Sequence, residues 1–216
     1  KYRVGICFGD SYSNGSDEWP AILAQYGYAL FVSSWTGYGL AYFDGKATEA
    51  LDLDSFPDFG DATVDFCVIQ SSVNAASLAT WDAQTQLNTC ADLIRKAQLA
   101  NKKVFVTNAV VNTTLTDAKR LEMREYNAAL QFLCSQKNAV YIDICGLITD
   151  PDNRNQLLAA YDAGDNIHPS AAASWAATCA WHGRPARTPP RPASSRRTGH
   201  PTRHGARQPV RGCAVD

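Results

Sequence analysis

Short apolar runs that alternate with segments of helical periodicity constrain the fold of this chain more than any other feature. The apolar runs are Arg3–Phe8, Tyr28–Ser33, Val64–Gln70, Lys103–Thr107 and Ala139–Cys145. Runs of this length, rich in Val, Ile and Phe, predict buried strands. The helical segments are Asp17–Gln25, Thr80–Asn101, Asp117–Gln136, Asn153–Ala163 and Ser170–Ala180. This alternation is typical of βαβ units, so we expect an α/β fold: a three-layer α/β/α sandwich around a flavodoxin-like, parallel five-stranded sheet.

The chain changes character after Trp181. Residues 1–181 carry 12 basic and 20 acidic residues and a net charge of −8, whereas residues 182–216 carry eight Arg, no Lys and a net charge of +7. The second segment has many Pro and no hydrophobic period, so it cannot bury enough surface to order itself. We therefore expect one folded domain over 1–181. The segment 182–216 is interpreted either as a disordered basic tail or, our preference, as a non-native extension.

Composition excludes several classes of protein. A content of 45% hydrophobic and 19% charged residues is that of a globular domain. No apolar run reaches the ~20 residues of a membrane span, and the acidic body argues against a nucleic-acid partner. No signal peptide is visible, but one could have been removed, so the compartment is unknown from the sequence; of the alternatives we favour a secreted or periplasmic location. The oligomeric state is not readable from the sequence.

The seven cysteines form no CxxC motif, which disfavours a zinc site or a redox motif. Three of them, Cys7, Cys67 and Cys145, fall in apolar strand-like runs, where buried free thiols are common. We expect mostly free core cysteines, with one or two disulfides as the alternative.

A serine follows the first predicted strand, in the segment Gly9-Asp10-Ser11. The carboxyl ends of parallel strands face the ligand crevice in open α/β sheets, and the positive end of a following helix favours a developing alkoxide. Ser11 is therefore a candidate nucleophile. The alternative is a simple turn with a solvated serine.

A second candidate group lies near the other end of the domain, in Asp165-Asn166-Ile167-His168-Pro169. His168 is the only histidine in residues 1–181, so it is the one imidazole that could activate a serine. Asp165 precedes it by three positions and could hold the ring in the correct tautomer. The alternative is an Asp that caps the last helix beside a surface His.

Together the Gly9-Asp10-Ser11 and Asp165-x-x-His168-Pro169 segments resemble the first and last blocks of the SGNH (GDSL-type) hydrolases. The resemblance covers about residues 3–175. It implies a triad of Ser11, His168 and Asp165. The nucleophile of α/β-hydrolases lies instead in a Gly-x-Ser-x-Gly pentapeptide, which this chain lacks.

The resemblance also implies an oxyanion hole made by the N–H groups of Ser11 and Gly37 and the side-chain amide of Asn74. Gly39 is an alternative to Gly37. The family places Gly-x-Asn-Asp after its third strand, whereas this chain has Ser72-Val73-Asn74-Ala75. The Asn is kept, but both of its characteristic neighbours differ.

The implied activity is hydrolysis of small carboxylic esters, with short acyl or acetyl groups carried on carbohydrate or lipid. No metal or cofactor is expected. Trp35, Tyr38 and Val73 are candidate substrate contacts, although the aromatic residues of this region could equally be core. Two alternatives are open: a non-catalytic flavodoxin-like domain that binds a phosphate or flavin, and a family member that binds carbohydrate without turnover.

Overall fold

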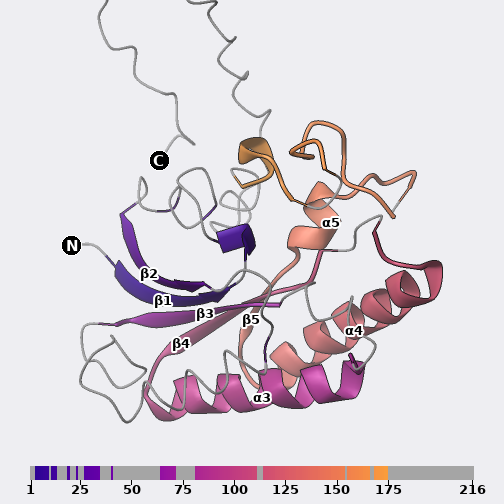
Figure 1. Ribbon diagram of the computed structural model, residues 1–216. Helices are drawn as coiled ribbons and strands as arrows, with labels where there is room; N and C mark the ends of the chain where they lie inside the picture. The colour runs from indigo at the N-terminus through magenta and orange to yellow at the C-terminus, as the bar shows by residue number, and fades with distance from the viewer. Residues whose placement is uncertain are drawn as a thin grey trace, which may run out of the picture.

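A parallel five-stranded sheet is the centre of the fold (Figure 1). The computed structural model describes residues 3–9, 11–13, 19, 23, 27–34, 40, 64–71, 81–110, 114–153, 155–165 and 168–174. Its strands are β1 (Arg3–Gly9), β2 (Tyr28–Ser34), β3 (Phe66–Gln70), β4 (Lys103–Thr107) and β5 (Val140–Ile142). Its helices are the short 3-10 helix η1 (Ser11–Ser13), α3 (Ala83–Leu99), α4 (Asp117–Gln136) and α5 (Ile144–Ile148). The strand order β2-β1-β3-β4-β5 is flavodoxin-like and confirms the predicted fold class.

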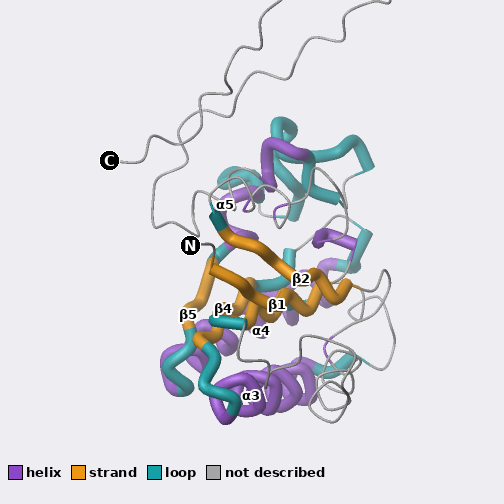
Figure 2. Tube along the Cα trace, turned by 90° about the vertical axis from the view of Figure 1, so that its left-hand side faces the viewer, coloured by secondary structure: helices purple, strands orange, loops and turns teal. Residues whose placement is uncertain are grey.

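Side chains alternate between the two faces of the sheet and bury a core on each. Ile6 and Phe8 of β1 belong to the core beneath α3 and α4. Cys7, between them, belongs to the opposite core with Trp19 and Leu23. Figures 1 and 2 show α3 and α4 side by side on the first of these faces. A sheet buried on both faces explains why its strands read as continuous apolar runs.

The predicted helices Thr80–Asn101 and Asp117–Gln136 form with small changes at their ends. α3 begins after Asp82, whose carboxylate accepts hydrogen bonds from the N–H and the hydroxyl of Thr85, each 2.7 Å long. α4 begins after Thr116, whose hydroxyl accepts from Lys119 N at 3.3 Å. These caps satisfy N–H groups that the first helical turn leaves unpaired. α3 buries Cys90, Leu93, Ile94 and Ala97 along one stripe.

Two sequence predictions are wrong. The strand predicted over Ala139–Cys145 ends at Ile142, because Asp143 accepts a hydrogen bond from Gly146 N (2.7 Å) and starts α5. The helix predicted over Asn153–Ala163 is absent from the described part of that range, which forms turns and an isolated bridge from Leu157 to Thr149. Upstream of it, Asp150 Oδ1 accepts from the N–H groups of Asp152 and Asn153, a local pairing that competes with helix formation.

The remaining helix predictions are described only in part. Trp19 and Leu23 are helical, and so are residues 171–174, while the rest of Asp17–Gln25 and of Ser170–Ala180 lies outside the described residues. The segment 182–216 also lies outside them.

The described cysteines agree with the prediction of free core thiols. Cys67, Cys90 and Cys134 are free and buried. Cys7 is also buried, and Cys145 is partly buried. Within the part of the chain that the structure describes, no helix has the length and apolar character that a membrane crossing requires.

Candidate active site

The candidate site lies at the carboxyl edge of the sheet, where β1 ends at Gly9 and the chain turns into η1 at Ser11. β1 is flanked by β2 and β3, which the chain reaches in opposite directions, so this edge contains the topological switch point. The backbone of Ser11 opens the 3-10 turn, and its side chain lies outside the described residues.

A buried polar group fixes the turn that carries Ser11. The hydroxyl of Ser13 donates to Gln70 Oε1 at the end of β3, and Trp19 Nε1 donates to the same oxygen at 3.4 Å. A Cβ added at Gly9 would overlap the hydroxyl of Ser13. The glycine of the Gly9-Asp10-Ser11 block therefore leaves room for the hydrogen bond that ties the turn to β3.

Asp165 and His168 form the second part of the site. Asp165 Oδ2 lies 2.6 Å from His168 Nδ1, and Asp165 Oδ1 accepts from His168 N at 2.7 Å. Both side chains are about half exposed, 47% and 41% respectively. A carboxylate at Nδ1 selects the tautomer in which Nε2 carries the lone pair, as a general base requires. The pairing predicted from the three-residue spacing is present.

Backbone hydrogen bonds join the residues on either side of this pair. Ala163 N donates to His168 O at 3.0 Å, and Ser170 N donates to Tyr161 O at 2.8 Å. Gly164 has a φ of +105°, in the region that favours glycine. These hydrogen bonds fix the backbone of His168 relative to residues 161–163.

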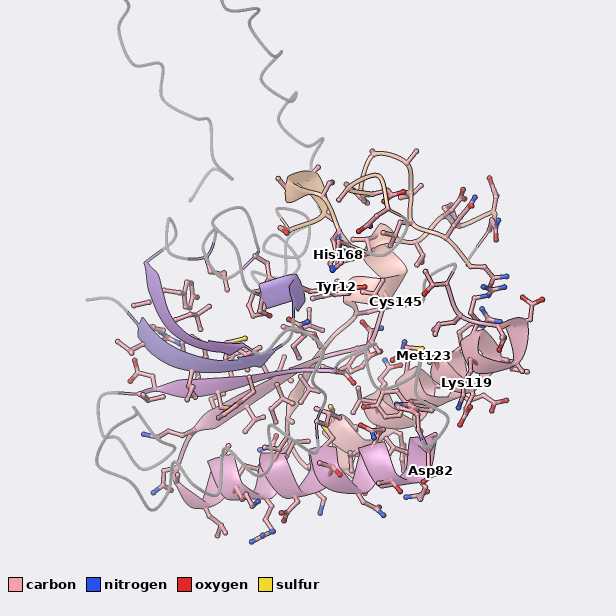
Figure 3. The ribbon with its side chains drawn as sticks, viewed as in Figure 1. Tyr12, Asp82, Lys119, Met123, Cys145 and His168 are labelled. Atoms are coloured by element: carbon pink, nitrogen blue, oxygen red, sulfur yellow. The ribbon has the colours of Figure 1, made fainter. Side chains whose placement is uncertain are left out.

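The two ends of the domain meet at Tyr12 and His168. Their ring centroids are 5.5 Å apart with an interplanar angle of 77°, an edge-to-face contact. Figure 3 shows the two side chains next to each other at the carboxyl edge of the sheet. Tyr12 directly follows Ser11, so this contact brings the predicted base to the turn that carries the predicted nucleophile. The sequence analysis did not identify Tyr12 as a site residue. The only indication in the sequence was its aromatic side chain directly after the candidate serine.

A pocket lies next to this contact, and polar residues at the ends of β3 and β4 are part of its lining. It is lined by Tyr12, Trp19, Gln70, Ser71, Thr107, Asn108, Val110, Ile144, Ile148, Pro169, Ala173 and Ser174. The loop after β4 is held by Asn127 of α4, which exchanges two hydrogen bonds with the backbone of Ala109 (3.0 and 2.8 Å). Asn108 Oδ1 accepts from Cys145 N at 2.8 Å and so joins this loop to α5.

The other predicted site residues are not placed. They lie outside the described residues and are Trp35, Gly37, Tyr38, Gly39, Val73 and Asn74. The structure thus brings Asp165, His168 and the turn of Ser11 together, and it does not test the predicted oxyanion and substrate contacts.

Comparison with protein families gives one match across most of the chain. The model of the GDSL-like lipase/acylhydrolase family matches residues 7–176. No curated protein matches the chain.

Several solved structures share the fold at low sequence identity. A member of the lipolytic protein G-D-S-L family from Veillonella parvula is 18% identical with a TM-score of 0.67, over 84% of this chain and 97% of that one. A GDSL-like lipase from Bacteroides thetaiotaomicron is 14% identical with a TM-score of 0.62, over 81% and 83%. A catalytic mutant of an acetylxylan esterase from Geobacillus stearothermophilus is 14% identical with a TM-score of 0.64, over 84% and 93%.

Proposed function

Because the chain belongs to the GDSL-like lipase/acylhydrolase family, we propose that it is a serine esterase that cleaves carboxylic esters through an acyl-enzyme. Ser11 is the nucleophile, His168 the general base and Asp165 the residue that orients it. The observation that carries this proposal is the pairing of Asp165 with His168 Nδ1 at 2.6 Å, on a ring that packs against Tyr12 beside Ser11.

In the first half of the proposed reaction, Ser11 Oγ attacks the ester carbonyl while His168 Nε2 takes the hydroxyl proton. The electron pair of the carbonyl π bond moves to the carbonyl oxygen, which becomes the oxyanion. When the intermediate collapses, the bond to the alcohol oxygen breaks and His168 gives its proton to that oxygen. The alcohol leaves and the acyl group remains on Ser11.

In the second half, His168 takes a proton from water, and the resulting hydroxide attacks the acyl carbon. Collapse of this second intermediate breaks the bond to Ser11 Oγ, which regains the proton from His168. The oxyanion of both intermediates is stabilised by the N–H groups of Ser11 and Gly37 (or Gly39) and by the Asn74 amide. One such donor is typically worth about 2.7–4 kcal/mol of barrier.

The proposed substrates are esters with short acyl or acetyl groups, carried on carbohydrate or lipid. An acetylxylan esterase is among the proteins with this fold, which supports acetylated carbohydrate as one candidate. Trp35, Tyr38 and Val73 are the proposed substrate contacts, and residues 1–181 the proposed catalytic domain. A series of p-nitrophenyl esters of increasing acyl length measures the acyl preference directly.

The proposal is tested with Ser11→Ala. We expect loss of p-nitrophenyl acetate hydrolysis, and we expect a fluorophosphonate probe to label Ser11 in the unaltered protein, as located by mass spectrometry. Ser135→Ala is the matched control, because Ser135 is an exposed residue of α4. Activity retained in Ser11→Ala would reject the assignment. A folded protein without hydrolysis or labelling would instead favour the non-catalytic alternatives, a flavodoxin-like binding domain or a carbohydrate-binding family member.

A further inference from the structure

The contact between Asp165 and His168 fixes the imidazole at one atom only. Both side chains are about half exposed, and the carboxylate meets the ring at Nδ1. Water competes for a hydrogen bond at such an exposed position, so this bond alone holds the ring weakly. A contact at Nδ1 also leaves the ring free to tilt about that atom, and the tilt decides where the opposite nitrogen, Nε2, points. A general base therefore needs a second contact that sets this direction.

Tyr12 makes a contact of this kind with the His168 ring. Its side chain is only 6% exposed and belongs to the same core as Ile148, Leu157 and Ala173. Its ring meets the imidazole edge to face, with centroids 5.5 Å apart (Figure 3). A ring in a close-packed core has little freedom to move, so it presents a fixed surface to the more exposed imidazole.

The turn that carries Tyr12 is itself fixed to the sheet. Tyr12 is the middle residue of η1, between Ser11 and Ser13. The Ser13 hydroxyl donates to Gln70 Oε1 at the end of β3, and the same oxygen accepts from Trp19 Nε1 at 3.4 Å. Because one peptide bond joins Tyr12 to Ser11, the position of the Tyr12 ring is tied to the backbone of the proposed nucleophile.

We propose that Tyr12 is a positioning residue for His168: its buried ring sets the tilt of the imidazole, so that Nε2 points toward the turn that carries Ser11. This inference rests on the proposed function, because it gives Tyr12 a role in the same reaction. Asp165 and Tyr12 then have separate roles. The carboxylate selects the tautomer at Nδ1, and the phenol ring sets the direction of the imidazole.

The proposal predicts a kinetic defect in Tyr12→Leu, which removes the aromatic ring and keeps an apolar side chain in the core. A misdirected general base slows proton transfer and leaves substrate binding almost unchanged. We expect kcat for p-nitrophenyl acetate to fall by about tenfold, with KM within about twofold. Tyr12→Phe keeps the ring and should bring kcat back to within about threefold of the unaltered protein. Tyr12→Met, whose flexible side chain adapts to gaps in a core, gives the same comparison if Tyr12→Leu does not fold.

The orientation of the imidazole can be followed by NMR without any substrate. Relaxation of the His168 ring carbons gives an order parameter, which reports motion on the picosecond to nanosecond timescale. A His168→Ala spectrum identifies these signals among those of the four histidines of the chain. We expect the order parameter to fall in Tyr12→Leu and to recover in Tyr12→Phe. A merely structural role of Tyr12 would lower the unfolding midpoint without a selective change in this ring.

Tyr28→Leu is the matched control. Tyr28 makes an edge-to-face contact of similar geometry with Phe66, with centroids 6.0 Å apart and an interplanar angle of 82°. It lies at the start of β2, whereas the candidate site lies at the carboxyl edge of the sheet. We expect Tyr28→Leu to leave both kcat and the order of the His168 ring unchanged. All variants are assayed well below their unfolding midpoints.

The outcomes distinguish the two proposals. If Ser11→Ala abolishes activity but Tyr12→Leu leaves kcat or the order of the His168 ring unchanged, the positioning role is wrong and the assignment of Ser11 stands. The positioning role is also wrong if Tyr12→Phe loses as much activity as Tyr12→Leu, because the ring is then not the group that matters. If Ser11→Ala retains activity, the proposed function fails, and the role of Tyr12 in the reaction fails with it.

Discussion

Polar side chains at the ends of β3 and β4 are buried as completely as the apolar core, and their pairing differs from residue to residue. Gln70, Ser71, Thr107 and Asn108 are each at most 4% exposed. Gln70 binds Ser13, Ser71 binds Tyr126, and Asn108 binds Asp143 and Cys145. Within the described structure the Thr107 hydroxyl has no hydrogen-bond partner. Gln70, Ser71 and Asn108 are therefore fixed by hydrogen bonds to other elements, whereas Thr107 carries a polar group without a partner.

This difference predicts that Thr107→Val stabilises the protein. Valine has nearly the shape of threonine and removes a buried hydroxyl whose desolvation is not offset, so we expect the free energy of unfolding to rise by about 1 kcal/mol. Urea unfolding followed by circular dichroism measures the change. Thr149→Val is the matched control of opposite sign, because the Thr149 hydroxyl is paired with Cys145 O at 2.7 Å. A loss of stability in Thr107→Val would show that its hydroxyl is hydrogen-bonded in solution.

At the scale of single residues, sequence reasoning predicted groups with chemical signatures and missed groups defined by contact. The pairing of Asp165 with His168 follows from a three-residue spacing and from the lack of any other histidine in residues 1–181. The contacts of Tyr12 with His168 and of Tyr126 with Ser71 join residues far apart in the chain. No local pattern encodes such contacts, because they depend on how the helices pack across the sheet.

At the scale of elements, the strands were predictable because burial on both faces makes them short apolar runs. The errors arose where polar side chains bind the backbone. Asp143 ends the fifth strand early by capping α5, and Asp150 turns the chain in front of the helix expected over Asn153–Ala163. Apolar periodicity predicts which face of an element is buried. It does not predict where a single aspartate accepts hydrogen bonds from backbone N–H groups and so ends a strand or prevents a helix.

The cap of α3 predicts a pH-dependent contribution to stability. Side-chain and backbone hydrogen bonds from Thr85 lower the pKa of Asp82 below its ordinary value of 3.8. A carboxyl group with a lowered pKa in the folded state stabilises it above the pKa of the unfolded chain, and this contribution disappears as the pH falls through the folded pKa. We expect Asp82→Ala to lower the urea midpoint at neutral pH.

The difference between Asp82→Ala and the unaltered protein should shrink below about pH 4. Urea midpoints measured across the acid range test this directly. The exposed Asp152 is the control: it lies outside any helix, and Asp152→Ala should leave the midpoints nearly unchanged. A destabilisation by Asp82→Ala that is independent of pH would mean that the cap acts through helix propensity and not through its charge.

At the scale of the whole molecule, the described cysteines are distributed through both cores of the fold. Cys67, Cys90 and Cys134 belong to the core beneath α3 and α4, and Cys7 belongs to the opposite one. Burial raises the pKa of the Cys67 and Cys90 thiols and raises that of Cys134 to about 12. Cys145 of α5 is only partly buried. The cysteines therefore differ in access, and burial suppresses the thiolate form of Cys67, Cys90 and Cys134; access and thiolate content are the two properties that set cysteine reactivity.

We accordingly predict that, among the cysteines that the structure describes, iodoacetamide at mildly alkaline pH modifies Cys145 before the four buried ones. The buried cysteines should react at the rate at which the protein opens. Because burial raises the pKa of the Cys67, Cys90 and Cys134 thiols, these thiols contain almost no thiolate while the core is closed. Peptide mapping by mass spectrometry over time gives each rate, and labelling in concentrated guanidinium chloride is the control in which all sites react alike.

Since core opening is governed by global stability, Thr107→Val should slow the labelling of Cys67, Cys90 and Cys134 together and leave Cys145 unaffected. Rapid labelling of the buried thiols in the native protein would contradict a core closed on both faces of the sheet.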